Sequence, residues 1–460
     1  MSRARSHRRR RLTAAMTLAA WGLCATEVRG DVRESEAQQL HRRGVQCMDV
    51  IERPACAITN FEALLELRSG ERALHVDAML RLIRLYRAAG DLDGVKPLLR
   101  RFWDAGVKRE TRGHVPWSVR HLPAEVDVFF NVDIAGVAGA PLLQRVGHDV
   151  FEGVFTCDPA RRQDLDDERR FERAHRKAAK TGRDYKAILY EELERDQARE
   201  ARRAADRARG AKGPRGQPTP IVFEATCPVA RLLGFDDLAG WQRLAGGMNH
   251  HDFARSIAIA QLEGLEPRLA RAVEQAQLME IEPDHWRVPE LRYEGDDVDL
   301  VRLDVGELVI APPALADAML AAKRTRERTL SRTLDGLIAR VPRDTAFFLV
   351  LGEQAVYDFG LAGLEPAARN VLTALLPRPK GLQIAGLMGD DFGLFTRMPT
   401  DNPVKGRMLV SFARSLLDRS DDADDRRFLD GLDIAETKDR RALLASYVLS
   451  AAQIESLLLD

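Results

Sequence analysis

Leu122-Pro123-Ala124-Glu125-Val126-Asp127-Val128-Phe129-Phe130 recurs later in the chain as Val341-Pro342-Arg343-Asp344-Thr345-Ala346-Phe347-Phe348-Leu349. Each copy is a proline-led turn that feeds a strand with two adjacent phenylalanines. After both copies, the pattern continues through a helix, a pair of strands and a further helix. The sequence therefore predicts an α+β fold made of two related halves, each an antiparallel sheet with helices on one face.

The paired phenylalanines allow a sharper prediction. Consecutive side chains on a strand face opposite sides of the sheet, so one ring of each pair must enter the core. When the two prolines are aligned, Phe129 corresponds to Phe348. We therefore expect these two rings to share one face, while Phe130 and Phe347 share the other.

A family resemblance accompanies this pattern. Gly234-Phe235-Asp236-Asp237-Leu238, together with the two proline-led turns, resembles segments of exported bacterial proteins of unknown function that are built from repeated α+β modules. The resemblance covers about residues 116–460 and its motifs are short. It implies no established activity.

The N-terminal part is helical. Over residues 34–105 apolar side chains recur three and four positions apart, with one helix ending at Gly90 and the next beginning after Asp91. This region resembles about two tetratricopeptide repeats, which Tyr86, Gly90 and Asp91 match, whereas Val95 stands where the family prefers Ala. The resemblance implies a peptide-binding unit, and a short helical cap on the following domain is an equal alternative.

The first thirty residues predict export. An Arg-rich segment at residues 3–11 precedes an apolar run at 12–25, and Val28 and Gly30 supply small residues for cleavage before Asp31. The apolar run is shorter than the roughly 20 residues that span a bilayer, which makes a permanent anchor the weaker alternative. We expect a periplasmic, envelope-associated or extracellular protein.

The cysteines agree with that compartment. Cys24 would be removed with the leader. Because bacterial lipid attachment uses a Cys directly after the apolar run, a lipid-anchored form is the weaker alternative. Cys47, Cys56, Cys157 and Cys227 remain. Proximity favours disulfides Cys47–Cys56 and Cys157–Cys227, while four cysteines permit three pairings.

Charge argues against a nucleic-acid partner. The chain has 70 basic and 70 acidic residues, and residues 1–30 hold seven Arg and one Glu, which leaves 63 against 69 after cleavage. The only dense basic block lies in the leader, whereas phosphate binding needs a basic face. No later apolar run is long enough to span a membrane.

A charged segment interrupts the first half. Residues 169–209 are rich in Ala, Glu, Arg and Asp, which predicts a solvated helix or helical pair, and a Gly- and Pro-rich linker follows at 210–218. The predicted organisation is a leader at 1–30, a helical region at 31–112, a first half at 113–340 with the insertion 159–219, and a second half at 341–460.

Other elements follow from the periodicity. Strands are predicted at residues 241–248 and 253–262, an amphipathic helix at 266–279, and a helix near 366–376.

Asn249-His250-His251-Asp252 is the densest set of metal-ligand residue types, and His285, His121 and His148 could add to it. Neighbouring residues on a strand or turn point in different directions and rarely complete a tetrahedral site. We expect a polar hairpin turn here, without a metal.

Two further acidic segments, Gly389-Asp390-Asp391-Phe392-Gly393 and Gly295-Asp296-Asp297, have the composition of β-turns. The acidic run at residues 420–425 lacks the spacing of a calcium loop and favours a solvated linker.

No nucleophile elbow, zinc-protease helix, phosphate loop or dinucleotide fingerprint occurs in the sequence. No catalytic, metal or cofactor residue is therefore assigned. We expect an exported, non-enzymatic envelope protein with a protein partner or a structural role. The alternative is a secreted or periplasmic hydrolase with an unrecognised active site.

Overall fold

The structure is a computed structural model that describes residues 35–67, 71–107, 115–146, 156–208, 220–235, 238–342, 345–360, 378–419 and 432–454. Four sequence predictions lie outside these residues: the leader, the linker at 210–218, the helix near 366–376 and the acidic run at 420–425. The chain divides into two compact units, Met1–Leu74 and His75–Asp460.

The first unit contains a helical hairpin. Helix α2 (Glu36–Val45) continues into a π-helical turn (Gln46–Val50), and α3 (Pro54–Glu66) follows. Ser35 and Gln38 form a capping box at the start of α2, since each side chain is bonded to the other residue's backbone N–H. Helix α3 begins with Pro54, a residue that suits the first turn of a helix, so both helices begin at favourable residues.

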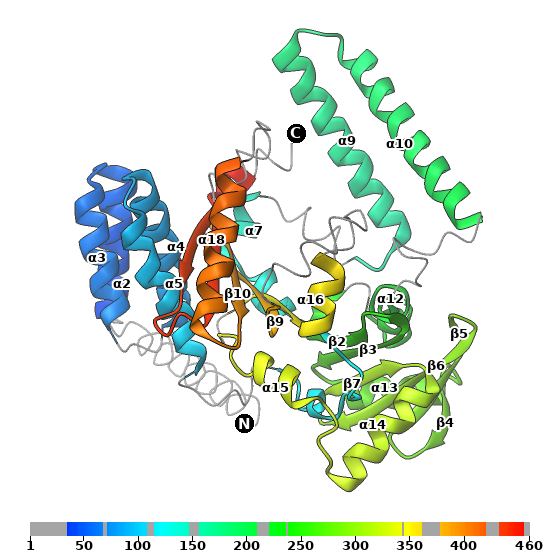
Figure 1. The fold of residues 1–460 in the computed structure, drawn as a ribbon. Helices are drawn as coiled ribbons and strands as arrows, with labels where there is room; N and C mark the ends of the chain where they lie inside the picture. Colours follow the sequence, from blue (N-terminus) through cyan, green and yellow to red (C-terminus); the bar gives the residue numbers. More distant parts are fainter. Residues whose placement is uncertain are drawn as a thin grey trace, which may run out of the picture. The chain divides into compact units, whose positions relative to one another are not determined.

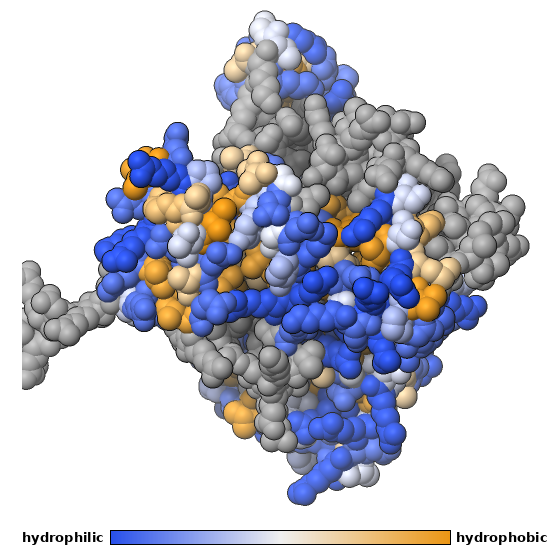
Figure 2. Space-filling model, turned by 60° about the vertical axis from the view of Figure 1, so that its left-hand side comes forward, coloured by the Kyte–Doolittle hydropathy of each residue, from blue (hydrophilic) through white to orange (hydrophobic). Residues whose placement is uncertain are grey.

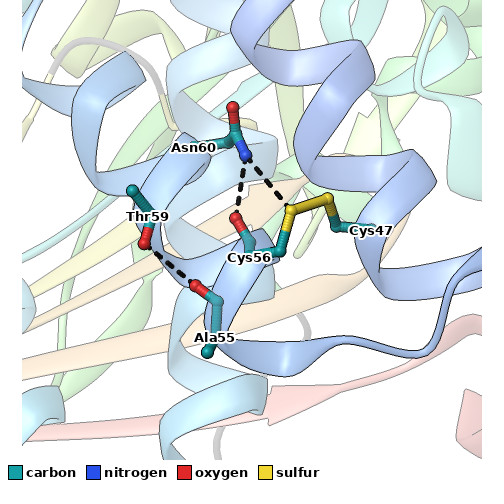
Figure 3. Close-up of a disulfide and its surroundings, with 5 residues drawn as sticks. All are labelled: Cys47, Ala55, Cys56, Thr59 and Asn60. Atoms are coloured by element: carbon teal, nitrogen blue, oxygen red, sulfur yellow. Dashed lines mark hydrogen bonds between the residues drawn. A yellow bond between two sulfur atoms is a disulfide. The ribbon is translucent and has the colours of Figure 1, made fainter.

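A disulfide joins the two arms of this hairpin. Cys47 and Cys56 are bonded, with their Cα atoms 5.7 Å apart (Figure 3). The Asn60 side chain donates to the Cys56 carbonyl oxygen at 2.8 Å and lies over the sulfur (Figure 3). Phe61 is fully buried, and a side chain at Gly44 would collide with its ring. The predicted pairing of these two cysteines is confirmed.

The second unit is organised by one antiparallel sheet of twelve strands in the order β11-β12-β10-β9-β8-β1-β2-β3-β7-β6-β5-β4. The strands are β1 (Val128–Asp133), β2 (Trp241–Asn249), β3 (Asp252–Leu262), β4 (Met279–Glu282), β5 (His285–Tyr293), β6 (Asp296–Asp304), β7 (Glu307–Ala311), β8 (Phe347–Gly352), β9 (Gly381–Met388), β10 (Phe392–Pro399), β11 (Leu432–Glu436) and β12 (Ala442–Leu449).

The predicted mixed α+β class and antiparallel pairing are confirmed. The two sheets predicted for the two halves join into one continuous sheet. Strands β1 and β8 pair with each other at the centre, where Phe130 lies opposite Leu349. Outward from this seam, β1-β2-β3-β7-β6 on one side has the same strand order as β8-β9-β10-β12-β11 on the other. The hairpin of β4 and β5 extends only the first half.

The helices of the second unit are α4 (Arg72–Ala88), α5 (Leu92–Val107), α6 (Ile134–Ala138), α7 (Pro141–Val146), α9 (Pro159–Thr181), α10 (Tyr185–Ala208), α11 (Ile221–Glu224), α12 (Thr226–Leu232), α13 (Leu265–Glu274), α14 (Pro313–Thr325), α15 (Arg332–Ile338), α16 (Glu353–Gly360) and α18 (Pro403–Arg419), with 3₁₀ turns η2 (Trp117–His121) and η3 (Leu238–Gly240). The first residues of α4 belong to the first unit.

Helices cover both faces of the sheet, which corrects the expectation of a single covered face. On β10, the Phe395 ring contacts Phe102 of α5 with centroids 4.4 Å apart. Three positions further along, Met398 packs on the other side with Leu409 and Val410 of α18. Three positions along a strand reverse the face. A wide sheet with two apolar faces requires this double cover.

The phenylalanine prediction agrees with the structure. Phe129 and Phe348 are fully buried, and their rings contact each other with centroids 5.7 Å apart. Phe130 and Phe347 are half-buried, and Phe130 packs into the apolar clusters of the opposite face.

Some predicted boundaries were wrong. The helix predicted at 266–279 ends at Glu274, because Ala276 takes a positive φ of 54° and the Gln277 N–H bonds back to Ala272. The following residues form β4, a short strand at the edge of the sheet. Strand β11, at the opposite edge, was also not predicted.

The charged insertion forms the expected helical pair. Figure 1 shows α9 and α10 as two long helices side by side, and they contact each other directly. The Asp158 side chain caps α9, and Gly182 ends it with a positive φ of 66°. Cys157 and Cys227 are bonded at the base, with their Cα atoms 5.0 Å apart, so the second predicted disulfide is confirmed.

Candidate functional site

A cavity of about 750 Å³ lies at the β11 edge of the sheet. It is lined by Lys96 and Arg100 of α5, by Arg407, Val410, Ser411, Arg414 and Ser415 of α18, and by Ala435 and Glu436 of β11.

The cavity lies where two helices from opposite faces of the sheet both pack against its last strand, β11. Helices α5 and α18 both contact β11 and β12. Lys96 and Arg100 are four residues apart on α5, and Arg407, Ser411 and Arg414 follow one stripe of α18 at one- and two-turn spacing. Each helix therefore presents a cationic stripe to the same cleft.

The cleft is electropositive. Lys96 pairs with Asp93 at 2.5 Å, and the Arg100 Nε donates to the Glu436 backbone oxygen at 2.8 Å. Within the residues that the structure describes, neither Arg407 nor Arg414 forms an ion pair. Four cations thus face one carboxylate in the lining, a balance that favours an anionic ligand.

The floor of the cleft is an open strand edge. Thr437 donates its backbone N–H to the Ala442 oxygen at 3.1 Å, and Ala435 lies opposite Leu444 in the same ladder. Because backbone groups on a strand alternate in direction, those of Ile434 and Glu436 point away from β12. Among the described residues no further strand pairs with β11.

One face of the molecule is mostly polar. On the face that Figure 2 turns toward the reader, hydrophilic residues predominate and hydrophobic residues form separate groups. Two large apolar side chains on α18 are exposed, Val404 by 58 % and Met408 by 47 %. They lie beside Arg407 and add an apolar margin to the basic stripe.

The histidine pair forms the expected turn between β2 and β3, and two carboxylates converge on it. His250 is 1 % exposed and bonded through Nδ1 to Asp127 and through Nε2 to Asp358 at 2.7 Å. The Nε2 of His251 lies 3.8 Å from the same Asp358 oxygen. Burial tends to raise the pKa of Asp358, but hydrogen bonds from His250 and Gln354 outweigh it and lower that pKa.

The acidic segment at Asp390 and Asp391 also forms the expected turn, between β9 and β10. Arginines of α4 neutralise both carboxylates: Arg81 pairs with Asp390, and Arg84 bonds Asp391 at 2.6 Å. Asp391 is buried. This segment therefore anchors α4.

The two turns occupy equivalent places in the symmetric strand order, since each joins the second and third strands of its half. Each also meets a helix from the other half. His250 bonds Asp358 of α16, which follows β8, and Gly389 accepts from Leu142 of α7, which follows β1.

The remaining histidines are not brought to this turn. His285 bonds Asp299 at 2.9 Å, and His121 bonds the Glu327 oxygen at 2.8 Å. Burial lowers the pKa of His121. His148 lies outside the described residues. The turn between β5 and β6 consists of Glu294 and Gly295, whereas Asp296 and Asp297, which were expected in that turn, are the first residues of β6.

Sequence reasoning missed the cationic cleft and both carboxylates around His250. The spacing of Arg407, Ser411 and Arg414 was a visible signal, because they lie on the further helix that the sequence predicts after the strand pair of the second half, at residues 402–417. Nothing local connects His250 with Asp127 or Asp358, which are 123 and 108 residues away in the chain.

Among the described helices, none is long and apolar enough to cross a membrane. No family model, curated protein or solved structure matches this chain.

Proposed function

We propose that this chain is an exported, non-enzymatic envelope protein that binds an acidic, extended segment of a partner protein. The segment adds to the free edge of β11, between the cationic stripes of α5 and α18. The observation that carries this proposal is the electropositive cleft over an open strand edge.

Charge supports an acidic ligand. An extended segment projects alternate side chains to opposite sides, so acidic residues on one side meet Lys96 and Arg100 while those on the other meet Arg407 and Arg414. Such pairs at the rim of a cleft steer association and select against basic partners.

The strand edge supports an extended ligand. The outward N–H and carbonyl of Ile434 and the outward N–H of Glu436 offer main-chain hydrogen bonds to an added strand, the mode known as β-augmentation, while the Glu436 carbonyl already accepts from Arg100. Exposed edges are usually blocked by charge or cover to prevent unwanted pairing. Here four cations outnumber one carboxylate in the lining, which favours an acidic segment at this edge.

Export is supported by the leader pattern and by the two disulfides, which persist in oxidising compartments. A role in the envelope and the identity of the partner are part of the proposal.

The test is fluorescence anisotropy with a labelled peptide of repeating Glu-Glu-Val-Val, which carries Glu on both faces when it is extended, measured at low and at physiological salt. We expect saturable binding that weakens as salt screens the charges. The double variant Arg407→Glu/Arg414→Glu should lose binding at least tenfold. Arg231→Glu/Arg271→Glu, which changes the net charge equally on α12 and α13, should bind like the wild type.

A second probe separates strand addition from simple charge attraction. Two peptides of the same sequence carry N-methyl groups on alternate residues, one in each register, and one of them should lose binding while the charge is unchanged. If both methylated peptides bind equally well, strand addition is excluded. If the Arg407→Glu/Arg414→Glu variant binds the unmethylated peptide as tightly as the wild type does, the proposed charge recognition is excluded.

A further inference from the structure

The turn between β2 and β3 contains three side chains with metal-ligating atoms in close proximity. The ligand atoms of His250, His251 and Asp358 all lie within 4.8 Å of one another. The two imidazole rings are adjacent in sequence and lie against each other, with centroids 3.7 Å apart. The turn therefore overcomes the usual divergence of neighbouring side chains.

The spacing of these atoms is close to that of a tetrahedral site. Ligands about 2.0 to 2.1 Å from a Zn²⁺ ion lie about 3.3 Å from one another. The Asp358 oxygen is 2.7 Å from the His250 Nε2 and 3.8 Å from the His251 Nε2. Shifts of roughly half an ångström bring these two distances to the required value, and the two imidazole nitrogens, which lie within 4.8 Å of each other, must close by up to about 1.5 Å through rotation of the exposed His251 ring.

The surroundings supply the outer support that metal-binding histidines need. His250 is bonded through its other ring nitrogen to Asp127, and its backbone N–H also donates to Asp127 at 2.9 Å. This carboxylate–histidine arrangement fixes which nitrogen faces a metal. Gln354 donates to the Asp358 carboxylate at 3.0 Å and orients it in the same way.

Access to the site is one-sided. His250 is 1 % exposed, Asp358 is 26 % exposed and His251 is 65 % exposed. An ion can therefore enter from the side of His251, displace the direct contact between His250 and Asp358, and retain a water as its fourth ligand.

The donor set selects the type of ion. Two imidazole nitrogens and one carboxylate suit Zn²⁺ and neighbouring transition metals, whereas Mg²⁺ and Ca²⁺ prefer oxygen ligands. We propose that His250, His251 and Asp358 form a Zn²⁺ site, with Asp127 and Gln354 as its supporting hydrogen-bond partners. The site is independent of the cleft at β11.

The experiment uses the mature, disulfide-bonded chain after treatment with a chelator. Titration with Co²⁺ should produce the visible absorption of a four-coordinate ion at one equivalent, and Zn²⁺ should abolish it. Isothermal titration calorimetry then measures Zn²⁺ affinity directly. His251→Ala removes the exposed ligand and should weaken Zn²⁺ binding at least tenfold. Asp127→Asn removes the carboxylate that supports His250 and should weaken Zn²⁺ binding about tenfold.

His175→Ala is the matched control, because His175 is also an exposed histidine and lies on α9 against Tyr185. It should bind Zn²⁺ like the wild type. His251→Ala should keep the wild-type circular dichroism spectrum, because its side chain is largely exposed. Wild-type Zn²⁺ affinity in His251→Ala, or no binding to the wild type at millimolar Zn²⁺, would overturn the proposal.

Discussion

Glu307 shows how single side chains hold the sheet to its surroundings. It is 5 % exposed at the start of β7, and its carboxylate accepts hydrogen bonds from the Trp117 N–H at 2.6 Å, the Ser118 N–H at 2.9 Å and the Ser118 hydroxyl. These donors belong to the first turn of η2, where backbone N–H groups lack helical partners. The carboxylate therefore caps a turn that is distant in sequence.

Glu307→Gln should lower the free energy of unfolding by about 1 to 3 kcal/mol, because an amide replaces a buried charged acceptor and brings an NH₂ group against the donors. Urea unfolding measures the change. Glu290→Gln, at an exposed position of β5, should change it by less than about 0.5 kcal/mol. Equal effects of the two substitutions would contradict the capping role.

The paired phenylalanines give a second prediction at this scale. Phe129→Ala and Phe348→Ala should each cost about 3 to 5 kcal/mol, because both rings are fully buried and pack on each other. Phe130→Ala and Phe347→Ala should cost less, because these rings are only half-buried. Urea unfolding of the four variants checks the ranking, and a Phe130 cost above that of Phe129 would refute it.

At the scale of elements, α4 is fixed to the sheet by a ladder of ion pairs. Arg81, Arg84 and Arg87 stand three residues apart on α4, and they pair with Asp390, Asp391 and Asp433 in that order. One helix face thus meets both a turn and a strand of the second half.

Arg84→Ala should destabilise the second unit by about 1 to 3 kcal/mol, because it leaves Asp391 buried without its cation. In the double variant Arg84→Ala/Asp391→Asn the loss should be smaller than the sum of the single losses, since the buried charge is also removed. Thermal unfolding of the wild type, the two single variants and the double variant, followed by circular dichroism, measures this double-mutant cycle. Lys405→Ala, which breaks an exposed pair with Asp401, serves as the control, and additive losses would show that the ladder does not couple α4 to the turn.

The elements that the sequence predicted are those whose periodicity is complete within one segment. The helices of residues 34–105, the pair β2 and β3, and the paired phenylalanine strands all carry such a pattern. The short edge strands β4 and β11 have only four and five residues, too few for a clear alternation. The cleft was missed because it forms where α5 and α18 meet one of these edges.

At the scale of the whole molecule, the second unit tolerates a long excursion within its first half. Helices α9 and α10 contact each other, and Ala174 and Ile188 are buried within the pair. The disulfide between Cys157 and Cys227 closes the base of the excursion. All twelve strands of the sheet therefore lie outside the segment that this disulfide encloses.

Replacement of residues 160–216 by a short Gly-Ser linker should preserve a single cooperative unfolding transition, because the excursion adds little to the core of the sheet. Differential scanning calorimetry of the shortened chain measures this. A broad or divided transition would show that α9 and α10 belong to the cooperative core of the second unit.

The bridge at the base of the excursion also bears on how the chain reaches this structure. Strand β2 must find β1 although a long segment separates them, and loop closure costs more as the connecting chain grows. Once Cys157 and Cys227 are joined, the path between the strands runs through the two sulfurs and omits the 70-residue separation. The loop that must close before β1 and β2 pair is then shorter, and its closure costs less entropy. We therefore expect oxidation to speed the folding of the central sheet and to leave its final strand order unchanged.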